Sequence, residues 1–268
     1  MLKDITLGQY FPGNSIAHKL DPRTKILLVT LYIIALFSAK GWTGYAVMAV
    51  TLAACVKVSH VGLRALVRGL KPLVFIIAFT GILNMFFTPD THYLWEWGIL
   101  RVSVKGIENA LFMVIRIMLL VMGTFLMTYT TSPIRLTDGL ESLLNPLKKI
   151  HVPVHELAMM MAIALRFIPT LIEETDKIMS AQKARGADFD SGNIFQKAKA
   201  LVPILVPLFI SAFRRADELA TAMECRCYHG GEGRTKLHVL KYQRRDYVAL
   251  AGGVVILVLV VALRRLGA

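Results

Sequence analysis

The sequence predicts an all-α integral membrane protein with about five transmembrane helices and a further region of long amphipathic helices. Three observations support this fold class. The 268 residues are 55% hydrophobic and only 18% charged, with a mean hydropathy of +0.56, which is far more apolar than a soluble domain of this length. Five apolar stretches approach the length that crosses a bilayer. Two longer helical patterns begin apolar and end charged.

The first two predicted spans are residues 26–39 and 45–58. The Lys40-Gly41-Trp42-Thr43-Gly44 segment between them fits a tight turn at a membrane surface, because it combines glycines with an interfacial aromatic residue. No apolar run precedes residue 26, so we expect no cleavable signal peptide. The connection after the second span contains four basic residues and no acid: Lys57, Arg64, Arg68 and Lys71. The positive-inside tendency therefore places this connection and the N-terminus in the cytoplasm.

Residues 72–87 and 106–131 are the third and fourth predicted spans. The segment 88–105 between them contains Tyr93, Trp95 and Trp97 and is expected to form an external loop with an aromatic belt. The almost purely apolar stretch 247–263 is the fifth predicted span. Five crossings from a cytoplasmic N-terminus place the C-terminus outside, where Arg264 and Arg265 go against the charge rule.

The region between the fourth and fifth spans has a different character. Ser132-Pro133 is a good helix start, and the amphipathic pattern after it fits a helix along the membrane surface. Residues 155–186 and 196–228 then form the two long helical patterns. A straight helix of about thirty residues extends roughly 45 to 50 Å, beyond a hydrocarbon core of about 30 Å. The prediction is a membrane region 1–131, a cytoplasmic or interfacial region 132–245 and a C-terminal transmembrane helix 246–268.

Each long pattern ends in a similar tripeptide, which we call the first tip (Ala184-Arg185-Gly186) and the second tip (Cys225-Arg226-Cys227). Arginine presents a rigid, charged donor group suited to carboxylates and carbonyls, so two such tips predict docking into another protein. The alternative is a solvated cation at each helix C-terminus, which the helix dipole favours by about 0.3 to 1 kcal/mol. Cys227 adopts a left-handed conformation less readily than glycine, so the backbone of the second tip is the less predictable one.

Three polar residues interrupt the apolar patterns: Asn84, Arg116 and Arg166. Charges at membrane depth are costly and are functional candidates for that reason. A proton or solute path would also require acids, and the first three spans contain none. We therefore expect Asn84 and Arg116 to join helices or to face a partner protein.

Several classes of function lack their motifs. The sequence has no P-loop, no zinc-hydrolase His pair and no Gly-x-Ser-x-Gly elbow. Cys225 and Cys227 have only His229 as a near neighbour with ligand chemistry, whereas a closed zinc site usually needs four ligands, so no metal is predicted. The net charge of +13 fits cytoplasmic basic residues of a membrane protein better than nucleic-acid binding, because no nucleic-acid-binding module is visible.

Four segments in order give the chain a family resemblance: residues 20–25 (LDPRTK), 165–169 (LRFIP), 184–187 (ARGA) and 222–228 (AMECRCY), the last followed by GGEGRT at 230–235. Together they resemble the transmembrane T component of energy-coupling factor (ECF) transporters, the ATP-driven vitamin importers of prokaryotic cell membranes. The resemblance covers nearly the whole chain.

The resemblance implies a coupling domain whose two long helices dock into two ABC ATPase subunits. It places Arg185 and Arg226 in the docking sites, flanked by Ala184, Gly186, Cys225 and Cys227. It also implies a separate membrane substrate-binding S component that selects the vitamin. ATP and Mg would bind to the partner ATPases, so the resemblance implies no cofactor and no catalytic residue in this chain.

Two alternatives stay open at this point. A self-contained membrane enzyme would use Met159, Met160, Met161, Arg166 and the cysteines around an interfacial site, although methionines at helical spacing more often serve packing. The permease of an ordinary ABC importer would carry a Glu-Ala-Ala coupling loop, which is not found. The small and adaptable residues of the second span, including Ala46, Met48 and Ala49, fit either an S-component contact or ordinary packing.

Overall fold

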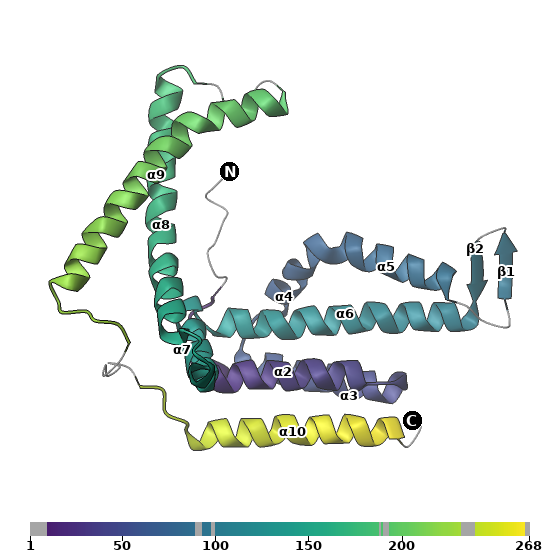
Figure 1. Cartoon of the computed structure of the whole chain (residues 1–268). Coiled ribbons are helices and arrows are strands. Elements are labelled where there is room, and N and C mark those ends of the chain that lie inside the picture. The colour runs from purple at the N-terminus through teal and green to yellow at the C-terminus, as the bar shows by residue number, and fades with distance from the viewer. Residues whose placement is uncertain are drawn as a thin grey trace. The chain divides into compact units, whose positions relative to one another are not determined.

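The computed structural model describes residues 10–88, 93–97, 100–187, 189, 193–231 and 239–265 (Figure 1). Within these residues the chain forms two compact units. The bundle unit contains residues up to 142 and from 240 onward, and the long-helix unit contains residues 143–239. The predicted division at residues 131 and 245 concerned which parts lie in the membrane, and it stays a prediction.

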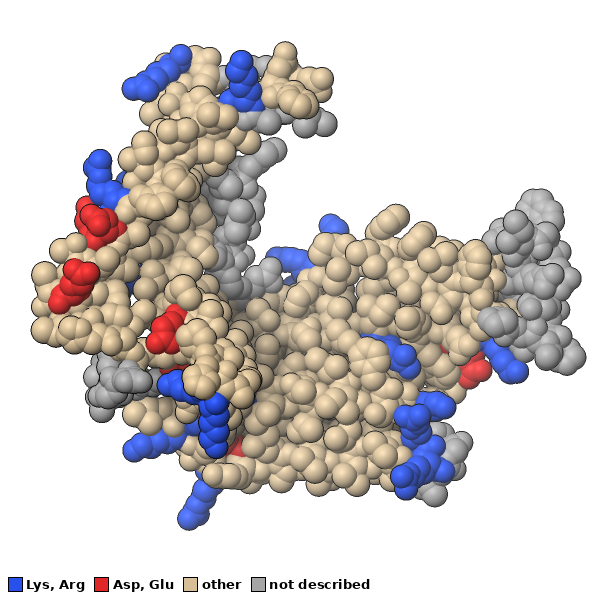
Figure 2. Space-filling view, in the orientation of Figure 1, with Lys and Arg blue, Asp and Glu red and all other residues tan. Residues whose placement is uncertain are grey.

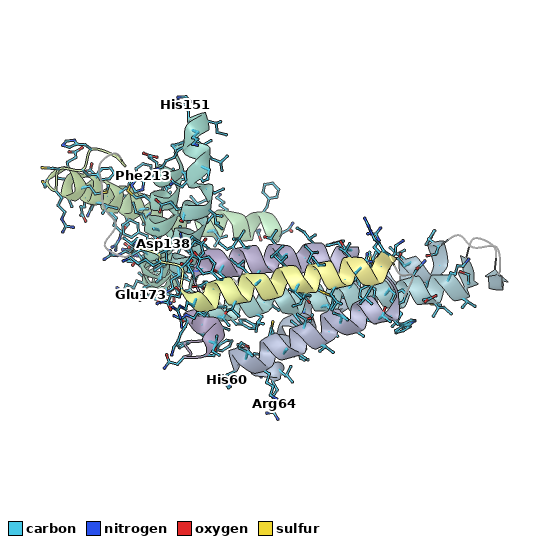
Figure 3. All side chains as sticks on the ribbon, turned by 90° about the horizontal axis from the view of Figure 1, so that it is seen from below. His60, Arg64, Asp138, His151, Glu173 and Phe213 are labelled. Carbon is cyan, nitrogen blue, oxygen red and sulfur yellow. The ribbon has the colours of Figure 1, made fainter. Side chains whose placement is uncertain are left out.

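The bundle unit is built from helices in this order: α1 (Ile16–Lys19), α2 (Pro22–Ser38), α3 (Gly41–Ser59), α4 (Leu63–Leu70), η2 (Lys71–Leu73), α5 (Val74–Phe87), α6 (Val104–Thr130), most of α7 (Pro133–Leu144) and α10 (Arg244–Arg265). Helix α6 packs against α2, α3, α4 and α5. Helix α10 lies along α2, although more than 200 residues separate them in sequence (Figures 1 and 3).

The core of this unit lies where α2, α3, α4, α6 and α10 meet. Its most deeply buried side chains include Leu36, Met48, Leu66 and Val260. Gly123 allows a close approach between α2 and α6, because a Cβ there would lie 2.5 Å from the Tyr32 ring. On the outside, large apolar side chains cover α5 and α10, among them Phe75, Phe79 and Val255. Most of the visible face is uncharged, with Lys and Arg gathered toward the helix ends, as expected for a bilayer-embedded surface (Figure 2).

The all-α class is confirmed, with one departure within the described residues. The segment predicted as an external loop contains a two-stranded antiparallel hairpin of β1 (Tyr93–Trp97) and β2 (Leu100–Ser103), in which Trp97 pairs with Leu100. Aromatic residues suit strands as well as membrane interfaces, so the same residues that indicated an aromatic belt also favour this hairpin.

Five described helical segments are long and apolar enough to cross a membrane: Gly41–Ser59, Leu63–Phe87, Val104–Thr130, Val154–Ala184 and Arg244–Arg265. The predicted number of five is confirmed, but the set differs from the prediction. The first predicted span lies in α2, which has only 17 residues. In its place stands the helix Val154–Ala184, whose first half is apolar enough to qualify although its charges gather in the second half.

The long-helix unit contains η3 (Asn145–Ile150), α8 (Val154–Ala184) and α9 (Ile194–Glu224). The two long helices have 31 residues each, about 46 Å at the rise of an ideal helix. Both continue through their internal prolines, Pro169 in α8 and Pro203 and Pro207 in α9. Figure 1 shows α9 changing direction along its length, for which the two prolines supply a physical cause.

Candidate docking site at the helix tips

The first tip is a helix end with a left-handed residue directly after the C-cap. Arg185 is the C-cap of α8, and Gly186 follows it with φ +86°. The Gly186 N–H donates to Lys183 O at 3.0 Å, and the Ala187 N–H donates to Gln182 O at 3.0 Å. This pair of hydrogen bonds is the Schellman motif, in which the last helical carbonyls are satisfied and the chain turns away sharply.

The second tip has the same geometry. Cys227 adopts φ +56°, its N–H donates to Glu224 O at 2.8 Å, and the Tyr228 N–H donates to Met223 O at 3.1 Å. Arg226 therefore occupies the same position in its motif as Arg185 does in the first. The sequence left this backbone open because cysteine is less suited than glycine to positive φ, and the structure shows that Cys227 nevertheless adopts it.

All six tip residues are exposed: Ala184, Arg185, Gly186, Cys225, Arg226 and Cys227. Within the described part of the chain, neither Arg185 nor Arg226 has a hydrogen bond or ion pair to its guanidinium. Each guanidinium is thus available to an outside acceptor, at a helix end whose dipole favours a cation. Their role in docking stays a prediction.

Three side-chain hydrogen bonds fix how α8 and α9 pair. Glu174 of α8 accepts hydrogen bonds from Ser211 Oγ at 2.6 Å and from Arg215 Nη2 at 2.7 Å. Further along, Gln182 Nε2 donates to Pro203 O at 3.4 Å. This carbonyl would ordinarily pair with the N–H four residues later, but residue 207 is a proline and has none. A glutamine from α8 therefore partners a carbonyl that the proline leaves unpaired.

These contacts make the pair antiparallel and set the spacing of the tips. Gln182 lies level with Pro203 and Glu174 with Arg215, so residue numbers rise in opposite directions along the two helices. The first tip therefore lies beside the first half of α9, whereas the second tip lies at the far end of α9. At about 1.5 Å per residue, the 23 residues from Pro203 to Arg226 separate the tips by about 35 Å along that helix.

The three polar residues of the apolar patterns have different surroundings. Arg116 joins two helices, because its Nε donates to the hydroxyl of Tyr45 at 2.8 Å and its guanidinium lies 5.7 Å from the Phe37 ring. Asn84 instead bonds within its own helix, donating to Thr80 O at 3.0 Å. Arg166 is exposed on α8. The structure does not bring these three together into one site.

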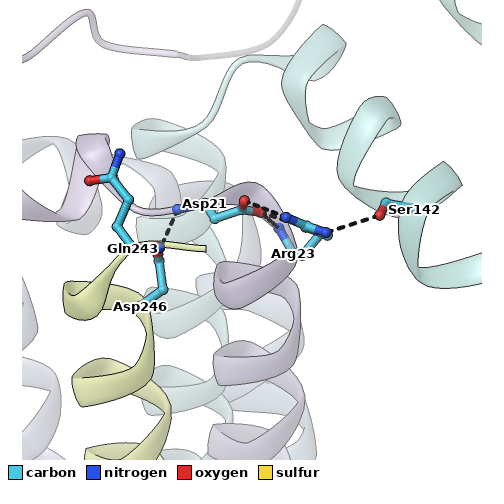
Figure 4. Close-up of polar contacts among 5 residues, drawn as sticks. All are labelled: Asp21, Arg23, Ser142, Gln243 and Asp246. Atoms are coloured by element: carbon cyan, nitrogen blue, oxygen red, sulfur yellow. Dashed lines mark hydrogen bonds and ion pairs between the residues drawn. The ribbon is translucent and has the colours of Figure 1, made fainter. Parts of the chain in front are cut away.

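Sequence reasoning missed a polar network at the start of α2, which we call the Arg23 network (Asp21, Arg23, Ser142 and Tyr242); Figure 4 draws the first three of these residues. Asp21 caps α2 by accepting the Arg23 N–H at 2.9 Å, and its carboxylate accepts Nε and Nη2 of the same arginine at 3.1 and 2.9 Å. Arg23 Nη1 donates to Ser142 Oγ at 3.3 Å, and the guanidinium lies 4.0 Å from the Tyr242 ring. The LDPRTK segment had indicated only family resemblance.

Two neighbouring residues extend this network. Asp246, only 1% exposed, accepts the Asp21 N–H at 2.9 Å and the Gln243 N–H at 2.8 Å, so one buried carboxylate joins the starts of α2 and α10. Lys25, just before the predicted span, donates to Thr130 O at 2.8 Å and Thr131 Oγ1 at 3.0 Å at the end of α6. Burial, with the positive charge of Arg135, lowers the pKa of Lys25 to about 8.

The cysteines do not form a metal site with other residues of the described structure. Within that part of the chain, no group of three or more His, Cys, Asp or Glu residues is arranged to hold a metal ion. Cys225 and Cys227 are free thiols, and both are exposed.

The long apolar helices define the class of multi-pass helical membrane proteins, and comparison with known proteins gives the family. Residues 13–237 match the family model described as cobalt transport protein. Curated relatives named energy-coupling factor transporter transmembrane protein EcfT match almost end to end. The one from Ruminiclostridium cellulolyticum is 55% identical over 92% of both chains. The one from Acidaminococcus fermentans is 55% identical over 98% of this chain and 97% of its own.

A more distant relative of the same name, from Bacillus subtilis, is 46% identical over 98% of this chain and all of its own length. The chain belongs to the family of energy-coupling factor transporter transmembrane proteins. It is therefore a multi-pass transmembrane component of an ECF transporter, which confirms the resemblance drawn from the four sequence segments.

Proposed function

We propose that this chain is the coupling subunit of an ECF-type ABC importer in a prokaryotic cell membrane. It passes motion driven by ATP from two ABC ATPase subunits to a membrane S component that binds a vitamin or another micronutrient. The observation that supports this most is the pair of exposed arginines, Arg185 and Arg226, which end two helices in the same Schellman geometry.

The spacing of the tips supports two ATPase partners rather than one. Helix pairing separates the tips by about 35 Å, so two separate acceptor sites are needed. A buried arginine needs acidic or carbonyl partners, and we expect grooves of that kind on both ATPases. In this proposal ATP and Mg bind to the partner chains, where hydrolysis occurs, and this chain carries no cofactor. The tips and the N-terminus lie in the cytoplasm.

The surface of α9 supports a contact with the S component. Before its charged end, the helix exposes a series of large apolar side chains: Leu205 and Val206 between its two prolines, and Phe209, Ile210 and Phe213 after them. This apolar surface lies on the same helix that ends in the second tip. A displacement of that tip by an ATPase would therefore move Phe209, Ile210 and Phe213 directly, since these residues follow the last proline of α9 and share one uninterrupted helical stretch that ends at the tip.

The docking role is tested by co-purification of the ATPases with Arg185→Ala, Arg226→Ala and the double variant. Loss of one partner of a buried charged pair typically costs about 2 to 5 kcal/mol, so each single variant should recover less ATPase and the double variant less than about a tenth of the wild-type amount. Arg64→Ala is the matched control, because Arg64 is an exposed arginine at the edge of the bundle unit (Figure 3). Unchanged recovery with the double variant would contradict the proposal.

A further inference from the structure

The chain passes twice between the bundle unit and the long-helix unit within the described residues. The first crossing lies between residues 142 and 143, near the end of α7, and the second between residues 239 and 240, shortly before α10. A force applied to the long helices reaches the bundle unit through these covalent crossings. The bundle side of each crossing consists of the bundle residues next to it, up to Ser142 at the first and from Leu240 at the second. The contacts that hold these residues therefore decide how much of the motion of the long helices reaches the bundle unit.

A single side chain, Arg23, contacts the bundle side of both crossings. Its Nη1 donates to the hydroxyl of Ser142 at 3.3 Å, and Ser142 is the last bundle residue before the first crossing (Figure 4). Its guanidinium lies 4.0 Å from the ring of Tyr242, the third bundle residue after the second crossing. Planar stacking on an aromatic ring and simultaneous hydrogen bonding are possible for arginine but not for lysine.

The same arginine is held rigidly on its other side. Asp21 accepts two of its hydrogen bonds, at 2.9 and 3.1 Å, and the two side chains are only 13% and 4% exposed for Arg23 and Asp21 respectively. A bidentate pair with little exposure fixes the guanidinium far better than a solvated ion pair does.

The backbone around the Arg23 network is also closely packed. A Cβ at Gly139 of α7 would lie 3.0 Å from Pro22 Cβ and 3.2 Å from the Pro22 carbonyl carbon, so α7 lies directly on the start of α2. Asp246 ties the start of α10 to the same point through the Asp21 N–H. Moving the bundle side of either crossing away from α2 thus requires breaking contacts that all meet at the first turn of α2.

We propose that Arg23, held by Asp21, is a positioning residue that ties the bundle side of both crossings to α2, so that displacement of the long helices moves the bundle unit instead of being absorbed by local movement of Ser142 and Tyr242 away from α2. This inference rests on the proposed function, because it concerns motion that the ATPases supply. A local network of this kind transmits motion when it keeps two connected segments from moving independently.

Two variants weaken the Arg23 network without removing its charge. Arg23→Lys keeps a cation beside Asp21 but loses the bidentate pairing and the stacking. Ser142→Ala combined with Tyr242→Leu leaves Arg23 and Asp21 intact and removes both contacts to the crossings. The matched controls are Arg64→Lys, at an exposed arginine on α4, and Thr80→Val, at a threonine whose hydroxyl donates to Ile76 O in its own helix.

The measurement is hydrogen–deuterium exchange of the purified complex with its ATPases, without nucleotide and with Mg-ATP plus vanadate. In the wild type, nucleotide should change exchange at the first tip, residues 182–187, and at the α3–α4 turn of the bundle unit, residues 59–62. Both variants should keep the change at the tip and reduce the change at the turn at least threefold. Both controls should behave as the wild type does.

The outcomes separate this inference from the proposed function. An unchanged response at the turn in both variants overturns the inference, as does a wild type that responds at the tip but not at the turn. Failure of both variants to assemble with the ATPases would assign the network to stability alone and also overturns it. A wild type that recovers no ATPase, or shows no response at the tip, contradicts the proposed function itself.

Discussion

Single residues explain why the two tips share one geometry despite different sequences. Gly186 and Cys227 hold equivalent left-handed positions, which cost a residue with a Cβ about 1 to 2 kcal/mol relative to glycine. The hydrogen bonds of the motif offset this cost at Cys227, since both of its Schellman bonds are at 3.1 Å or less. Arg226 is therefore presented in the same way as Arg185.

Exchanging the two residues tests this explanation. Cys227→Gly should stabilise the end of α9 by about 1 kcal/mol and Gly186→Cys should destabilise the end of α8 by a similar amount. A Cβ at Gly186 meets no atom within 4 Å, so the cost there is purely conformational. Amide exchange at residues 182–187 and 223–228 is the measurement. Equal exchange in the variants and the wild type would show that positive φ is not strained at these positions.

The Arg116–Tyr45 contact predicts a stability effect inside the bundle unit. Tyr45 is only 4% exposed, so Arg116→Leu leaves its hydroxyl buried without this donor, at a cost of about 1 to 3 kcal/mol. Asn84→Leu is the comparison, because that amide bonds within its own helix and its loss should cost less. Thermal unfolding in detergent measures both. A larger loss for Asn84→Leu than for Arg116→Leu would contradict the assignment.

At the scale of elements, the pairing of α8 with α9 depends on a few polar contacts that cross between them. Glu174→Gln should weaken the link to Arg215 and Ser211 only modestly, since the pair is partly exposed and solvent screens its charges. Glu173→Gln is a matched control one residue away, and Glu173 is exposed. Faster amide exchange at residues 208–216 in Glu174→Gln alone is expected. Equal exchange in the two variants would assign the pairing to apolar packing.

The elements also show where sequence patterns were sufficient. Apolar runs predicted helices close to α3, α5, α6 and α10, because a helix in a membrane must satisfy its backbone internally and needs about twenty apolar residues. The hairpin β1–β2 was missed, since Tyr93, Trp95 and Trp97 fit an aromatic belt equally well. The apolar first half of α8 was assigned to an interfacial helix because its later charges dominated the pattern.

At the scale of the whole molecule, sequence by itself determined the class of the protein and its family. Hydropathy, the two arginine tripeptides and four ordered segments were sufficient, because these properties are local in the chain and survive without knowledge of contacts. The docking candidates Arg185 and Arg226 also came from sequence alone. Their equivalence in backbone geometry did not come from sequence. Cysteine disfavours the positive φ that Cys227 adopts, and the hydrogen bonds that stabilise this turn are visible only in the structure.

Only the tertiary structure decided which residues far apart in sequence meet. The antiparallel pairing of α8 with α9, and hence the spacing of the tips, follows from contacts such as Glu174 to Arg215. The Arg23 network likewise joins Asp21, Ser142 and Tyr242, which no pattern in the sequence connects. The physical reason is that such contacts depend on how helices pack, whereas composition and periodicity report only what each helix needs by itself.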